Sequence, residues 1–124
     1  MSPRSEEFMA EARERLAVAG AALETGAFSA AVSLAYYAML NAARAALSEE
    51  DLYAKTHAGT WHLFREAFVE SERFDTALAG RAEKTQQLRL GADYEAQRVE
   101  PEDARGAVTL AEEFVAAIDA LYAS

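Results

Sequence analysis

The stretch AAVSLAYYAMLNAARAAL, residues 30–47, decides the fold. It predicts a helix from about Phe28 to Leu47, in which apolar residues surround the axis instead of lining one face. Such a helix must be covered on both sides, either by other helices of its own domain or by a second copy of the protein. The stretch therefore predicts a central helix and is a first indication of a homodimer.

Periodic apolar residues predict further helices on both sides of this one. The first helix runs from about Ser5 to Thr25 and ends at Gly26, because glycine adopts a left-handed C-terminal conformation without steric cost. The third begins after a polar link, residues 48–51, with Thr56 as its N-cap, and ends near Glu70. Their inward stripes are Phe8, Ala12, Leu16, Ala19 and Leu23 in the first helix, and Trp61, Phe64 and Phe68 in the third.

The fourth and fifth helices complete the predicted bundle. Asp75 can cap the fourth, which Gly91 weakens before the chain loosens around Ala96. Pro101 suits the first position of the fifth, which runs nearly to Tyr122. The inward residues are Leu78, Ala82, Thr85, Leu88 and Ala92 in the fourth helix, and Ala107, Leu110, Ala111, Phe114, Ile118 and Leu121 in the fifth. The sequence thus predicts one all-α domain over residues 1–124, a single helical bundle with five helical segments.

Composition limits the classes of function. A net charge of -9 repels the phosphates of nucleic acids, so any contact with them must be local. The absence of cysteine excludes disulfides, thiolate catalysis and cysteine metal sites. No apolar run approaches the roughly 20 residues that cross a bilayer, and the first residues, MSPRSEE, lack the pattern of a secretion signal. We therefore expect a cytoplasmic protein without membrane contact.

The densest polar cluster is QQLRLGADY, residues 86–94, in the last turns of the fourth helix. Arg89 and Asp93 are one turn apart, so the carboxylate can orient a guanidinium whose planar fork matches phosphate oxygens. Tyr94 adds a hydroxyl and a stacking face. Alternatively, Arg89 and Asp93 form an exposed pair of little energy while Tyr94 packs in the core.

A second cluster is KTHAG, residues 55–59, at the predicted start of the third helix. Free backbone N–H groups and the helix dipole favour an anion there, and Lys55 and His57 would contact it. Alternatively, His57 only caps or lines the loop. His62 is five residues further on, which places the two rings on different faces and disfavours a zinc site.

Other motifs of chemistry are missing from the sequence, so we expect neither a metal nor a cofactor. There is no glycine-rich phosphate loop, no nucleophile elbow and no zincin spacing. The paired glutamates, Glu6 with Glu7 and Glu112 with Glu113, suit solvated faces. Asn41 and Arg44 are polar groups on an apolar helix and need partners, which a dimer cleft could supply; equally, Arg44 could neutralise the acidic residues 49–51.

Three stretches together resemble the HEPN proteins of prokaryotes, particularly the small single-domain branch encoded beside nucleotidyltransferases. They are AAVSLAYYAMLNAARAAL at 30–47, KTHAG at 55–59 and RLGADY at 89–94, within a resemblance that spans about residues 5–122. The resemblance implies an up-and-down bundle of four to five helices that forms a homodimer, in which the two fourth-helix motifs face one cleft. In its ribonuclease members, a histidine follows the motif's arginine by four to six residues; here Tyr94 stands in that place.

Three functions follow from these observations. The first is a homodimeric subunit that binds nucleotide or RNA and pairs with a nucleotidyltransferase in a toxin-antitoxin system. There Arg89 and Lys55 contact phosphate, Asp93 orients Arg89, and Tyr94 stacks or accepts a nucleotide. The second is a metal-independent endoribonuclease toxin, in which Arg89 stabilises the transition state and His57 or Tyr94 moves protons. The third is a purely structural interaction domain.

Overall fold

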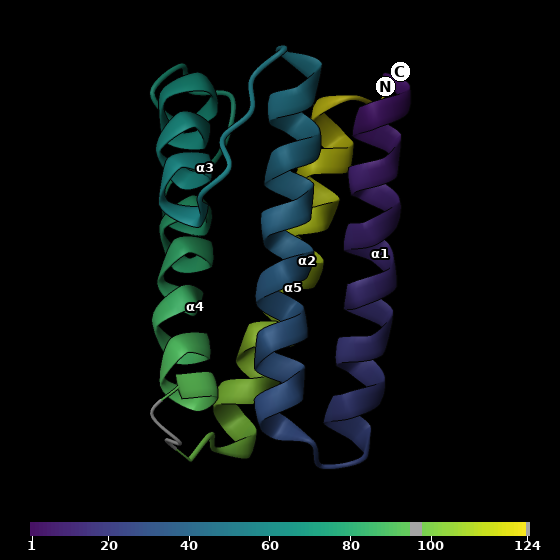
Figure 1. The fold of residues 1–124 in the computed structure, drawn as a ribbon, viewed down its shortest axis with the longest axis vertical. Coiled ribbons are helices and arrows are strands. Elements are labelled where there is room, and N and C mark those ends of the chain that lie inside the picture. Colours follow the sequence, from purple (N-terminus) through teal and green to yellow (C-terminus); the bar gives the residue numbers. More distant parts are fainter. Residues whose placement is uncertain (95–97, 124) are drawn as a thin grey trace.

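A computed structural model describes residues 1–94 and 98–123, and all its regular elements are helical. These elements are α1 (Pro3–Glu24), α2 (Phe28–Glu49), α3 (His57–Phe64), the π-helical turn η1 (Arg65–Val69), α4 (Thr76–Tyr94) and α5 (Pro101–Leu121). In Figure 1, α2 runs between α1 on one side and α3 and α4 on the other, with α5 behind it. The prediction of an all-α bundle is confirmed.

Helix α2 is covered by its own chain. It packs against α1, α5, α4 and α3. Its buried residues are Ala31, Val32, Ala35, Tyr36, Ala38, Met39, Leu40, Ala42, Ala43, Ala45, Ala46 and Leu47. Of the two ways to cover this helix, the bundle therefore uses its own helices, and the composition of α2 supplies no argument for a second copy.

Helix α1 begins two residues before the predicted start and ends where glycine predicts. The Ser2 hydroxyl caps it by accepting a hydrogen bond from the backbone N–H of Ser5, and Pro3 takes the first helical position. Gly26 has a φ of 81°, the left-handed conformation that stops the helix. Ala12 and Ala19 are fully buried, and their small side chains allow α1 and α2 to pack closely.

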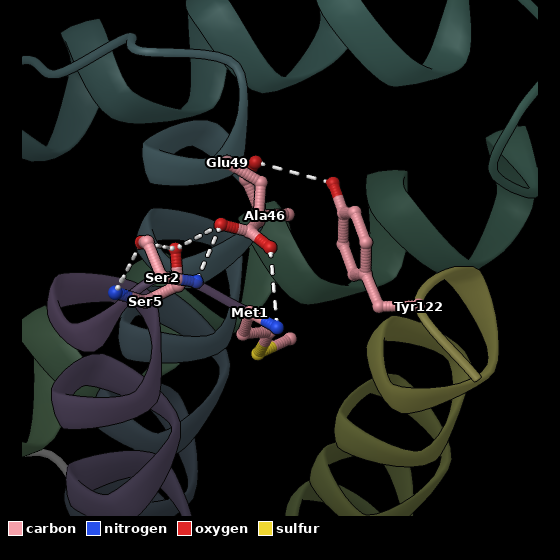
Figure 2. Close-up of polar contacts among 6 residues, drawn as sticks. All are labelled: Met1, Ser2, Ser5, Ala46, Glu49 and Tyr122. Atoms are coloured by element: carbon pink, nitrogen blue, oxygen red, sulfur yellow. Dashed lines mark hydrogen bonds and ion pairs between the residues drawn. The ribbon is translucent and has the colours of Figure 1, made fainter. Parts of the chain in front are cut away.

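Helix α2 continues two residues past its predicted end because Glu49 fastens it to the start of α1 (Figure 2). Glu49 Oε2 accepts hydrogen bonds from the Ser2 backbone N–H and the Ser5 hydroxyl, both at 3.0 Å. These bonds, the one from Ser2 foremost, lower the pKa of Glu49. On the other side, the Tyr122 hydroxyl donates to the Ala46 carbonyl at 3.3 Å, so the same end of α2 is also tied to the end of α5.

The third predicted helix is α3 followed without a break by η1. Thr56 caps α3, since its hydroxyl accepts from the backbone N–H of Gly59 at 2.9 Å. The predicted stripe of Trp61, Phe64 and Phe68 is buried. The change to π-helical bonding at Arg65 has no signal in the sequence pattern that predicted one helix to Glu70.

Helix α4 turns its predicted inward stripe to the core and buries one charged residue beside it. Asp75 caps it by accepting from the backbone N–H of Leu78 at 2.8 Å. Leu78, Ala82 and Thr85 are buried as predicted, and Leu88 and Ala92 are half-buried and pack against the core. Arg89 is buried as well. The inward side of α4 therefore carries a charged residue next to the predicted stripe.

Helix α5 follows its prediction closely. It begins at Pro101, with Glu102 and Asp103 in its first turn, and ends at Leu121. Phe114 lies at the centre of the aromatic core, with its ring centroid 5.9 Å from that of Trp61 and 5.6 Å from that of Phe64. These aromatic rings pack against α3 and thereby hold the residues at its start in place.

Candidate functional site

Two adjacent tyrosines of α2 bring the candidate residues together. The guanidinium carbon of Arg89, from α4, lies 5.2 Å from the ring centroids of both Tyr36 and Tyr37. The ring of His57, the first residue of α3, lies 5.6 Å from the Tyr36 centroid and 5.7 Å from the Tyr37 centroid. Arg89 and His57 are thus held on the same pair of rings by two different helices.

Arg89 is buried and ion-paired. Its side chain is 5% exposed, and its Nη1 donates to Asp93 Oδ2 at 3.2 Å. The same carboxylate oxygen accepts from the Ser33 hydroxyl of α2 at 3.3 Å. Asp93 is itself 31% exposed, so the pair reaches from the core to the surface. The pair is therefore buried at its Arg89 end and exposed at its Asp93 end, and the carboxylate contacts the guanidinium one helical turn away.

A chain of hydrogen bonds leads from the core to His57. Trp61 Nε1 donates to the Tyr36 hydroxyl at 3.1 Å, and that hydroxyl lies 3.1 Å from His57 Nδ1. Tyr36 and Trp61 are both buried, whereas His57 is half-buried. The ring of His57 is therefore fixed through Nδ1 by a buried hydroxyl.

The charges around the tyrosines change the ionisation of their neighbours. Burial lowers the pKa of His57 from 6.5, and the positive charges of Arg89 and Arg44 lower it further. Burial raises the pKa of Tyr36 from 10.0, so its hydroxyl keeps its proton at neutral pH. His57 is consequently a neutral imidazole at pH 7, next to two guanidinium groups.

The remaining polar residues of α2 find their partners within the chain. Asn41 donates to the carbonyl of Tyr37 at 2.8 Å, one turn back on its own helix. Arg44 Nη2 donates to the Lys55 carbonyl at 3.3 Å, and its guanidinium carbon lies 5.8 Å from the Tyr53 ring. Among the described residues, Arg44 thus fixes the loop before α3 instead of pairing with residues 49–51.

The predicted site residues are only partly brought together. Arg89 and His57 share the tyrosine pair, and Asp93 joins them through Arg89. The exposed Lys55 lies in the loop before α3, and Arg44 binds its carbonyl. Tyr94 is the last residue of α4, and its side chain lies outside the described residues. His62 is apart from this group: it is exposed and pairs with Glu66 at 2.5 Å.

Sequence reasoning missed Tyr36, Tyr37, Trp61 and Ser33 as site residues. Tyr36 and Tyr37 could have indicated a polar contact, because a tyrosine inside an apolar helix needs a hydrogen-bond partner for its hydroxyl. Spacing alone could not name that partner, since His57 and Trp61 lie on another helix.

Two surface hollows of about 530 and 700 Å³ lie elsewhere, along α1 and the outer side of α2. Both are lined by Arg4, and neither lining includes a predicted site residue apart from Asn41 in the second. No helix in the described part of the chain combines the length and apolar character that a bilayer crossing requires.

Comparisons with known proteins agree with the architecture. The family model described as HEPN domain matches residues 5–121. A UPF0332 protein from Gloeobacter violaceus is 31% identical over 76% of this chain and 75% of its own length. A protein of Methanocaldococcus jannaschii named "Putative toxin" is 33% identical over 84% of this chain and 78% of its own length.

Proposed function

The chain belongs to the HEPN family, and from this premise we propose that it binds the phosphates of a nucleotide or an RNA strand at Arg89, Asp93 and His57. The observation that carries the proposal is the position of Arg89. In a chain of net charge -9, a guanidinium lies inside the bundle, on two aromatic rings and beside an imidazole. A structural core does not require this charge, because apolar residues of similar volume stabilise at least as well.

The surroundings of Arg89 support an anionic ligand. Arg44 and Lys55 add two positive charges on the same side of α2, and the effect of Arg44 and Arg89 on His57 indicates a locally positive potential. The half-buried Tyr37 offers a ring on which a base can stack. In this arrangement Asp93 orients Arg89, Lys55 contacts the backbone of the ligand, and the protein acts in the cytoplasm.

A binding experiment tests the role of Arg89. Fluorescence anisotropy with a short labelled single-stranded RNA should show at least about a tenfold loss of affinity for Arg89→Ala, since a charge-assisted contact to phosphate is lost. Arg81→Ala is the matched control: it lies two turns earlier on α4, and its exposed side chain pairs with Glu113. Circular dichroism monitors helicity in both variants. Equal affinity of Arg89→Ala and the parent protein would remove the assignment.

One observation favours a second candidate, a metal-independent endoribonuclease toxin. The imidazole missing from the α4 motif is supplied near Arg89 by His57 of α3. A base could take the proton of a ribose 2′-hydroxyl, whose oxygen attacks phosphorus while the bond to the 5′-oxygen breaks and that oxygen takes a proton. Arg89 would stabilise the charge on the phosphoryl oxygens. The relative named as a toxin is consistent with this activity.

Cleavage assays separate the two candidates. The endoribonuclease predicts RNA fragments in the presence of a chelator, and their loss in His57→Asn but not in His62→Asn, because His62 lies exposed on another face. Binding without fragments, together with no growth arrest on expression, selects the binding subunit.

The proposed subunit is a homodimer that pairs with a nucleotidyltransferase. A half-buried stripe of α2, formed by Ser33, Tyr37, Asn41 and Arg44, lies beside the site and offers a second copy polar and aromatic contacts. Sedimentation equilibrium should give the mass of a dimer, and a monomer at all concentrations would exclude this assembly. A neighbouring nucleotidyltransferase gene whose product co-purifies with the chain would support the pairing.

A further inference from the structure

The tyrosine pair holds a histidine whose two ring nitrogens are in different environments. Nδ1 of His57 faces the buried Tyr36 hydroxyl at 3.1 Å, while the residue as a whole is only half-buried and Nε2 is at the opposite edge of the ring from Nδ1's partner. We infer that Tyr36 is a positioning residue, which holds neutral His57 in the tautomer that carries its proton on Nε2. His57 then offers a hydrogen-bond donor to a ligand.

The direction of the hydrogen bonds follows from the donors available. An indole N–H can only donate, so the Tyr36 oxygen must accept the bond from Trp61 Nε1. The Tyr36 hydroxyl has one proton, and among the described residues His57 Nδ1 is the acceptor that it reaches. Since Tyr36 is fully buried, the opposite arrangement would leave that proton without an acceptor away from water, which is costly.

Tyr36 also contacts the other half of the site. Its ring lies 5.2 Å from the guanidinium carbon of Arg89, while its hydroxyl binds His57. One side chain therefore sets the places of both the cation and the imidazole. Trp61 acts one step further back, because it fixes the hydroxyl that faces His57.

The tautomer defines the chemistry of the ligand. A neutral imidazole with its proton on Nε2 donates at that atom and cannot accept a proton there. The group opposite His57 is then an acceptor, such as a phosphate oxygen or the carbonyl oxygen of a base. This consequence rests on the proposed function and favours the binding subunit over a mechanism in which His57 Nε2 is the general base.

Nuclear magnetic resonance of the free protein tests the tautomer directly. A long-range proton–nitrogen correlation spectrum at neutral pH should show His57 protonated on Nε2 only. The second histidine, His62, pairs through Nε2 with Glu66 on another face and is the internal reference. Protonation of His57 on Nδ1, or an even mixture of both forms, would overturn the inference, and this spectrum needs no variant.

Tyr36→Phe tests the positioning role. It keeps the ring under Arg89 and removes only the hydroxyl, so the His57 signals should move toward a mixture of tautomers. The pH midpoint of His57 should rise, because the hydrogen bond to its neutral form is lost. The charged and titratable groups around the ring stay in place: Tyr37 and Arg44 on α2, Arg89 and Asp93 on α4, and Lys55 in the loop.

The control is Tyr37→Phe, which keeps the second ring and removes a hydroxyl that has no hydrogen bond to a described residue. It should leave the His57 tautomer unchanged. If Tyr36→Phe gives the same His57 spectrum and midpoint as the parent protein, Tyr36 has no positioning role. All these measurements are made without RNA, so a failure of RNA binding would leave the assignment of the tautomer standing, and the reverse also holds.

Discussion

Arg89 illustrates how a charged side chain can be both buried and available. Its guanidinium rests on two tyrosine rings, which reduces the cost of removing it from water, and Asp93 balances its charge at the surface end. A phosphate that approaches from the side of Asp93 meets a cation whose orientation is already set. Asp93, the carboxylate that orients Arg89, is also a negative charge that repels such a phosphate.

Replacing that carboxylate should strengthen RNA binding. Asp93→Asn keeps an oxygen that accepts from Arg89 but removes one negative charge, and a unit charge at this range is worth about 1 kcal/mol, or about fivefold in affinity. Anisotropy titrations of both proteins at equal salt measure the effect. Asp103→Asn, an exposed residue in the first turn of α5, makes the same change in net charge and should alter affinity little. Weaker binding by Asp93→Asn would contradict the prediction.

The ionisation of His57 should make stability depend on pH. Because its pKa is lowered in the folded state, the unfolded chain binds a proton first as the pH falls. The corresponding stability is complete above the ordinary value of 6.5 and is lost as the pH falls from 6.5 through the folded pKa. Glu49, whose pKa is lowered from 4.5, has the same sign, and its stability is lost only below 4.5.

Urea unfolding on both sides of pH 6.5 measures this effect. The free energy of unfolding should fall more steeply below 6.5 for the parent protein than for His57→Asn, which has no imidazole to titrate. His62→Asn should keep the steeper dependence of the parent. If the free energies of unfolding of the parent protein and of His57→Asn change in parallel with pH, folding does not lower the pKa of His57.

At this scale the sequence predicts contacts within one helix better than contacts between helices. Arg89 with Asp93 follows from helical spacing, because residues four apart share a face. Tyr36, Trp61 and His57 are brought together by packing between α2 and α3, which no local pattern encodes. The burial of Arg89 is unforeseen for a related reason: apolar periodicity finds the inward stripe from apolar residues alone and gives no signal for a buried charge.

Among the helices, four ends are predicted well by the type of residue that stands at or next to them, whereas the start of α1, which Ser2 caps, lies two residues before its predicted position. Thr56, Asp75, Gly26 and Pro101 all act as their residue types predict, because caps satisfy backbone groups locally. The end of α2 is missed because Glu49 is stabilised by a distant segment, the start of α1. The sequence pattern therefore places Glu49 in a polar loop, although it is the last residue of α2.

The start of α3 should tolerate no side chain at Gly59. A Cβ there would lie 2.8 Å from Thr56 Oγ1 and 3.1 Å from Ala54 Cβ, so the capping hydroxyl must move. We expect Gly59→Ala to destabilise the protein by about 1 kcal/mol, the usual cost of a lost N-cap, although alanine is ordinarily the better helix former. Because His57 lies in the same turn, RNA affinity should also fall.

Gly106→Ala is the matched control for this prediction. Gly106 lies inside α5, and a Cβ there would meet nothing within 4 Å. The substitution should therefore stabilise the protein by about 0.5–1 kcal/mol. Chemical denaturation gives the free energy of unfolding of both variants. A stabilising effect of Gly59→Ala would show that the Thr56 cap adapts without loss of stability.

For the whole molecule, the sequence predicts the class of fold but leaves the cover of α2 open. Both a bundle and a dimer would bury the same apolar residues, so the pattern from Ala30 to Leu47 cannot distinguish them. The cover depends on how α1, α3, α4 and α5 are placed around α2, which is a property of tertiary packing. The same packing makes α2, a helix of ordinary core residues, one side of the candidate site.

Net charge should limit the number of phosphates that the protein contacts. Single-stranded nucleic acid releases about 0.7 counterions per phosphate neutralised, so contacts by Arg44, Lys55 and Arg89 predict a slope of about -2 for log affinity against log salt concentration. Lys55→Ala should reduce the magnitude of the slope by about 0.7. Outside this cluster, the surface of a chain whose overall net charge is -9 repels the strand and adds no further contacts. A slope of about -5 or steeper would mean that a broad face binds RNA, and a slope near zero would mean that phosphates are not contacted at all.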